Sequence, residues 1–209
     1  MFHFCYRFQT TSSLADHGDF VVPIEVDVMA YGDEVEFEYR FGYFAIDRIL
    51  WQKAIDRGIS LFEVCDGDSQ GMYEMHEILT NNSGDIRKDF KLDAEVEEVL
   101  FVHGMVIHPE LAEYRTAILN AAMEPLSGRS LETIWQETCS LRDKSLYSLG
   151  FRKIAGKPLF ARHWTFRNEY SEANPNGLEG DFIGTPEHHE WTAQELKNRY
   201  GIGTSEDPS

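Results

Sequence analysis

The sequence of 209 residues predicts an α/β domain built on a mixed sheet and followed by an irregular C-terminal tail. Three patterns predict this fold class. The N-terminal part alternates apolar and polar residues with the period of two that half-buried strands show. Residues 99–107 are almost continuously apolar, which is typical of a central strand buried on both faces. Apolar residues at three- and four-residue spacing in other segments indicate amphipathic helices.

An antiparallel unit of strands is expected first. Residues 2–8 place aromatic side chains on one face of a strand. Residues 24–30 and 35–41 alternate in the same way, and Gly32 and Asp33 between them favour a hairpin turn. We therefore expect the first strand to be followed by a β-hairpin.

Two helices are expected after the hairpin. Ile46, Ile49 and Ala54 fall at helical spacing, and Gly58 follows where a C-terminal cap is expected. Residues 68–79 repeat apolar side chains at helical intervals and precede an Asn-Asn-Ser-Gly cluster that ends the pattern.

The second half of the chain alternates strands and helices. The expected strands cover residues 99–107, 131–138 and 158–166, and the expected helices cover residues 110–124 and 141–149. The strand–helix–strand order predicts that the strands of residues 99–107 and 131–138 are adjacent and parallel. The composition then changes beyond Tyr170, where Asn-Pro-Asn-Gly and Gly-Thr-Pro favour a linker. We expect one domain in residues 1–170 and a tail in residues 171–209, in which only residues 187–200 can form a short helix.

The charge and composition exclude several function classes. Asp and Glu number 36 against 19 Lys and Arg, so the formal net charge is −17. General nucleic-acid binding is not expected, because phosphate affinity depends on clustered Lys and Arg. No apolar run approaches the ~20 residues of a membrane-spanning helix, and the first residues lack a signal-peptide pattern. We therefore expect a cytoplasmic protein that binds no membrane. The three cysteines are widely spaced and predict neither disulfides nor a metal site.

Two short motifs resemble the acyl-CoA-binding half of the GNAT N-acetyltransferase superfamily. Residues 106–110, Val-Ile-His-Pro-Glu, are similar to the turn that ends the central strand of that family. Residues 149–151, Leu-Gly-Phe, are similar to the end of its short fourth helix. The resemblance spans residues 98–166, about a third of the chain. It implies a GNAT-like fold, acetyl-CoA as cofactor, and transfer of an acyl group to an amine on a small molecule or a protein.

The resemblance also implies which residues serve each role. In the family, the central strand separates from its neighbour, CoA binds in the gap, and its diphosphate binds free amides at the start of the next helix. The corresponding cofactor-binding residues in this chain are Val106, Ile107, His108, Arg115, Thr116 and Ala117. The resemblance also makes Tyr147 the candidate acid that returns a proton to the CoA thiolate. His103 is the candidate base that takes a proton from the amine, because it is a titratable residue beside Gly104 in the expected central strand.

Each of these assignments has a structural alternative. The family's phosphate loop contains glycines that let backbone amides approach the diphosphate, whereas residues 111–117 contain none. The helix that follows could therefore serve packing alone, and the chain would then be a non-catalytic GNAT-like module that binds a partner or a small ligand. His103 could be a core histidine. Tyr147 lies one residue from the family's position and could be a packed surface tyrosine.

Overall fold

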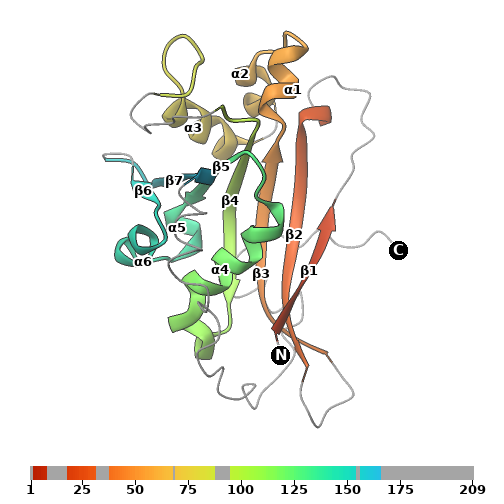
Figure 1. Cartoon of the computed structure of the whole chain (residues 1–209), viewed down its shortest axis with the longest axis vertical. Coiled ribbons are helices and arrows are strands. Elements are labelled where there is room, and N and C mark those ends of the chain that lie inside the picture. Colours follow the sequence, from red (N-terminus) through yellow and green to blue (C-terminus); the bar gives the residue numbers. More distant parts are fainter. Residues whose placement is uncertain are drawn as a thin grey trace.

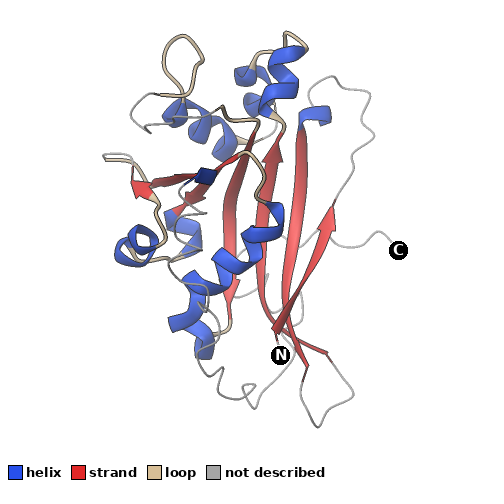
Figure 2. Ribbon diagram, in the orientation of Figure 1, coloured by secondary structure: helices blue, strands red, loops and turns tan. Residues whose placement is uncertain are grey.

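The computed structural model describes residues 2–8, 18–31, 38–67, 69–87, 95–153 and 156–165. Within these ranges, seven strands form one mixed sheet, and six α-helices accompany it (Figures 1 and 2). The predicted fold class, α/β with a mixed sheet, is confirmed. The expected tail, with its helix near residues 187–200, lies outside the described residues. None of the described helices has the length and apolar character needed to cross a membrane.

The first three strands are antiparallel neighbours. They are β1 (Phe2–Phe8), β2 (Val21–Tyr31) and β3 (Glu38–Ile49), and η1 (Gly18–Phe20) precedes β2. Strand β3 runs further than the sequence pattern predicted. The helix expected around Ile46 and Ile49 is wrong there, because both residues are buried in β3 and α1 begins only at Trp51. Residues three apart in a strand point to opposite faces, so burial on both faces imitates helical spacing.

Three short helices connect β3 to the central strand. They are α1 (Trp51–Asp56), α2 (Leu61–Asp66) and α3 (Gln70–Leu79), and they gather at the upper end of the sheet in Figure 1. The Ser69 hydroxyl caps α3 by accepting a hydrogen bond from the Met72 amide at 3.2 Å. The helix predicted over residues 68–79 is thus present, with its first helical residue at Gln70.

The central strand β4 (Glu98–Ile107) has an antiparallel neighbour on one side and a parallel neighbour on the other. It pairs with β3 and with β5 (Ser130–Trp135), and the parallel pairing with β5 is the one that the strand–helix–strand order predicted. The crossover consists of η3 (Pro109–Tyr114), α4 (Arg115–Met123) and η4 (Glu124–Leu126). The α-helix expected from Glu110 therefore starts five residues later, after a 3-10 helix.

The C-terminal part of the described chain completes the sheet. It contains α5 (Gln136–Cys139), α6 (Asp143–Ser148), β6 (Arg152–Lys153) and β7 (Leu159–His163). The sheet order is β1-β2-β3-β4-β5-β7-β6. The strand expected over residues 131–138 ends at Trp135, because the backbone turns into α5 at Gln136.

The sheet carries an apolar core on each face. Side chains alternate along β4, so Leu100 and Val102 join one core while Val99 and Phe101 join the other. The first core includes buried residues of α4 and α6, and the second includes buried residues of α1, α2 and α3. We call these the α4 face and the α1–α3 face of the sheet.

Candidate functional site

His103 is the extra residue of a bulge in β4. Ala45 of β3 pairs with Gly104, but the next residue, Ile46, pairs with Val102, so the register skips His103. A side chain at Gly104 would come within 3.2 Å of the Ala45 Cβ, which keeps this position small. Bulges redirect side chains and often occur beside active sites.

The pairing between β4 and β5 ends at the same level of the sheet. The parallel register runs from Glu98 with Ser130 to Val102 with Ile134, while β4 itself continues to Ile107. Beyond Val102, the chain after β5 turns into α5, which packs against β4. The bulge and the separation of the two strands therefore coincide at His103.

His103 forms a pair with Asp47 of β3. The His103 Nε2 atom lies 3.1 Å from the Asp47 Oδ2 atom, and the two side chains are 42% and 11% exposed. When Nε2–H donates to the carboxylate, Nδ1 is the basic nitrogen of the neutral ring. The arrangement is therefore a half-exposed imidazole oriented by a largely buried acid, which is the geometry of a general base.

Aromatic rings extend this pair across the α1–α3 face. The rings of His103 and Phe101 have their centroids 5.6 Å apart, and Phe101 meets Trp135 edge to face at 6.3 Å. Gly71, near the start of α3, lies against the Phe101 ring. The candidate base thus lies beside a row of aromatic rings, and the beginning of α3 lies next to the Phe101 ring of that row.

A second polar cluster on this face is neutralised internally. Asp27 of β2 pairs with Arg7 at 2.9 Å and with Arg40, and Arg7 also pairs with Glu25 at 3.1 Å. Burial raises the pKa of Asp27, although the two guanidinium groups oppose the shift. Burial, followed by the charge of Glu25, raises the pKa of Tyr43. Two acids facing two guanidinium groups carry no net charge, so this cluster has little attraction for a cationic ligand.

The predicted cofactor residues divide between a buried strand end and the start of α4. Val106, Ile107 and His108 are buried, and the His108 ring meets Phe41 edge to face at 5.9 Å. Between them and α4, η3 closes on itself, with the Leu111 amide donating to the His108 carbonyl at 2.9 Å. Turns of this kind use amides that a phosphate loop leaves free.

Arg115, Thr116 and Ala117 form the first turn of α4. The Nε atom of Arg115 is buried, and no group in the described part of the chain hydrogen-bonds to it. Tyr114 precedes the helix without a side-chain cap. Of the predicted cofactor residues, Arg115 is the one whose guanidinium could hold an anion by charge.

The structure does not bring Tyr147 together with His103. Tyr147 lies on α6 with its ring edge to face against Phe160 at 5.6 Å, and Phe160 belongs to the core of the α4 face. His103 stacks with Phe101, which belongs to the α1–α3 face. The candidate base and the candidate acid therefore lie over opposite faces of the sheet.

The sequence analysis did not identify two residues that lie beside the site. Asp47 interrupts an apolar stretch of β3, and its place on the same face as Tyr43 and Ala45 was the available signal. Cys139 of α5 places its thiol 3.8 Å from the Val102 carbonyl, beside the point where β4 and β5 separate. Burial raises the pKa of Cys139 to about 12, so this thiol stays protonated and is no nucleophile near neutral pH.

Comparisons of the chain with protein-family models, with curated proteins and with solved structures find no match.

Proposed function

We propose that this chain is a GNAT-like protein that transfers an acyl group from an acyl-CoA to an amine. The observation that carries the proposal is the His103–Asp47 pair, at 3.1 Å, on the β4 bulge where the pairing with β5 ends. From the resemblance we expect the acyl-CoA to bind in the gap between these two strands. A base at the point where the gap begins would contact the attacking amine.

His103 would act on the amine before the bond to the acyl group forms. An amine near neutral pH is mostly an ammonium ion, which cannot attack a carbonyl carbon. Nδ1 of His103 would take the proton, and the Asp47 carboxylate would stabilise the resulting imidazolium. The same carboxylate adds negative charge beside the position of the incoming cation.

The proposed cofactor site would hold an acyl-CoA differently from the phosphate loop of the GNAT family. Within the described residues nothing hydrogen-bonds to the buried Arg115 Nε atom, which suits an anion at the start of α4, whereas η3 withholds the amides of an ordinary phosphate loop. Arg115 would therefore hold the diphosphate by charge, beside Thr116 and Ala117. When bound, acetyl-CoA would supply an acyl group activated as a thioester. Because Tyr147 lies over the opposite face of the sheet from His103, the leaving thiolate would take up its proton from water.

The test combines calorimetry with an acylation assay on the full chain. Acetyl-CoA is titrated into the wild type, Arg115→Ala and, as a matched control, Arg129→Ala, whose side chain forms an exposed pair with Glu97. We expect Arg115→Ala to weaken binding by roughly tenfold or more, which corresponds to the loss of a charge-assisted hydrogen bond. His103→Gln should keep the binding and slow acylation of an amine panel by about 10²–10⁴-fold. Absence of saturable binding at millimolar acetyl-CoA would overturn the proposal.

A non-catalytic GNAT-like module is the second candidate function. The observation that favours it is η3, whose closed turns and glycine-free sequence occupy the place of the phosphate loop. In that case acetyl-CoA would give no heat in the same titration. Arg115→Ala would then change only the free energy of unfolding.

A further inference from the structure

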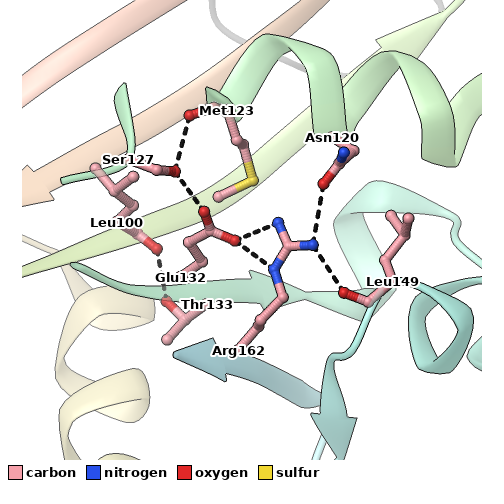
Figure 3. Close-up of polar contacts among 8 residues, drawn as sticks. All are labelled: Leu100, Asn120, Met123, Ser127, Glu132, Thr133, Leu149 and Arg162. Carbon is pink, nitrogen blue, oxygen red and sulfur yellow. Dashed lines mark hydrogen bonds and ion pairs between the residues drawn. The ribbon is translucent and has the colours of Figure 1, made fainter. Parts of the chain in front are cut away.

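A buried ion pair joins the last two long strands of the sheet (Figure 3). Arg162 of β7 and Glu132 of β5 are direct partners in the strand register, and their side chains are 1% and 0% exposed. The Arg162 Nε atom donates to Glu132 Oε2 at 2.6 Å, and Nη2 pairs with the same carboxylate. The guanidinium also stacks over Phe151, with Cζ 4.3 Å from the ring centroid.

The remaining nitrogen of Arg162 connects two helices. Nη1 donates to the Asn120 Oδ1 atom of α4 at 3.0 Å and to the Leu149 carbonyl at 2.7 Å (Figure 3). Leu149 directly follows α6 and begins the Leu-Gly-Phe motif. A single guanidinium therefore holds α4 and the end of α6 at fixed positions relative to β5 and β7.

The other carboxylate oxygen of Glu132 is connected to the C-terminal end of α4 through Ser127. Glu132 Oε1 and the Ser127 hydroxyl are hydrogen-bonded, and this hydroxyl lies 2.9 Å from the Met123 carbonyl, the last residue of α4 (Figure 3). Both the middle and the C-terminal end of α4 are thus connected to the same ion pair.

Stability alone is a weak explanation for such a network. Burying two charges costs desolvation energy that their attraction roughly offsets, and apolar residues of similar volume often stabilise a protein as well or better. Apolar contacts, however, are non-directional and tolerate sliding of one helix over another. A planar guanidinium with several fixed donors specifies a geometry that apolar packing leaves open.

We propose that Arg162 is a positioning residue that locks α4 to the end of α6. Helix α4 begins with Arg115 where β4 has ended, and α6 carries Tyr147 beyond the end of β5. The lock would therefore set the separation between the two elements that carry Arg115 and Tyr147. Its effect on ligand binding rests on the proposed function, whereas the mechanical coupling of the helices does not.

The test separates the α4 arm of the network from the ion pair itself. Asn120→Ala removes the acceptor on α4 and leaves Glu132 and Leu149 in place, whereas Asn120→Asp keeps an acceptor oxygen at that position. Arg129→Ala is the control, because it breaks an exposed ion pair elsewhere on the chain. Hydrogen exchange of each full-length folded variant is followed by mass spectrometry, and acetyl-CoA binding is measured by calorimetry.

We expect Asn120→Ala to accelerate exchange in α4 and α6 by roughly tenfold or more, which equals about 1.4 kcal/mol of local opening free energy. Exchange in α1, α2 and α3 should stay at the wild-type rate, and Asn120→Asp should restore protection. Equal acceleration in all helices, or none in α6, would overturn the proposal. If the helices respond as expected but the wild type binds no acetyl-CoA, the coupling stands and the proposed function fails.

Discussion

His103 and Asp47 contact each other across β3 and β4 at the residue that the strand register skips, with 3.1 Å between Nε2 and Oδ2. In a regular pair of strands, His103 would stand opposite a β3 residue of its own. Phe101, two residues earlier in β4, is the register partner of Asp47, and its ring lies beside that of His103. His103 therefore lies on the face of the sheet that carries Asp47, at the position where the register between the two strands shifts.

This pair should affect chemistry much more than stability. Because the imidazole is half exposed, Asp47→Asn should change the free energy of unfolding by less than about 1 kcal/mol. Amine acylation should fall by about tenfold or more, since the variant lacks the charge that stabilises the imidazolium. Denaturant titration and the acylation assay measure the two quantities, with Glu97→Gln as an exposed control. A large stability loss with an unchanged rate would show that the pair is structural.

The Arg162–Glu132 pair should give a strongly non-additive double-mutant cycle. Arg162→Met or Glu132→Leu alone leaves a buried charge without its partner and should cost about 3–5 kcal/mol. The double variant leaves no buried charge without a partner. Its loss of unfolding free energy should therefore be far smaller than the sum of the two single losses. Urea unfolding of the four proteins measures the coupling. The exposed Arg129–Glu97 pair serves as the reference cycle, with an expected coupling below about 1 kcal/mol. Additive losses at the buried pair would contradict this account.

Stability should fall in mildly acidic solution because of His76. This residue of α3 is buried, with its ring 6.3 Å from Trp51 and 6.1 Å from Phe62, and burial lowers its pKa while the charge of Glu77 opposes the shift. Since the pKa is depressed in the folded state, the unfolded chain takes up the proton first as the pH falls. The contribution of neutral His76 is therefore complete above about pH 6.5 and declines below it, by at most about 1.4 kcal/mol per pH unit.

His76→Phe isolates this contribution from that of other titrating groups. Free energies of unfolding are measured from pH 8 to pH 5 for both proteins, and the difference between the two curves is compared. The variant should lose less stability than the wild type between pH 6.5 and pH 5. Parallel curves over that interval would show that His76 does not titrate on unfolding.

Gly42 should tolerate no side chain. A Cβ at this position of β3 would lie 2.5 Å from the Ile107 Cδ1 atom and 2.8 Å from the Val106 carbonyl oxygen, and the latter is backbone of the adjacent strand. Gly42→Ala should therefore cost about 1–3 kcal/mol through overpacking. Gly128→Ala is the matched control, because a Cβ there meets nothing within 4 Å. Thermal melting of both variants tests the difference, and equal melting temperatures would contradict the close approach of β3 and β4.

Local pattern alone was enough to predict most of the elements. Alternation in β1 and β2 and the apolar run of β4 were recognisable because each strand meets the core through its own side chains. The parallel pairing of β4 with β5 also followed from the sequence, since a strand–helix–strand unit favours that arrangement. His103 was also a candidate from the sequence, because it is a titratable residue beside a glycine in the expected central strand.

Tertiary structure decided the features that depend on residues far apart in the chain. Ile46 and Ile49 joined a strand because the sheet is covered on both faces, which no local pattern reveals. His103 acquired Asp47 only through the register and the bulge between β3 and β4. Tyr147 came to lie over the opposite face because α6 packs against β7. The sequence by itself determined which segments are buried and with what period; long-range strand pairing and packing decided which polar groups meet, because contact across a sheet depends on register and face rather than on neighbours in sequence.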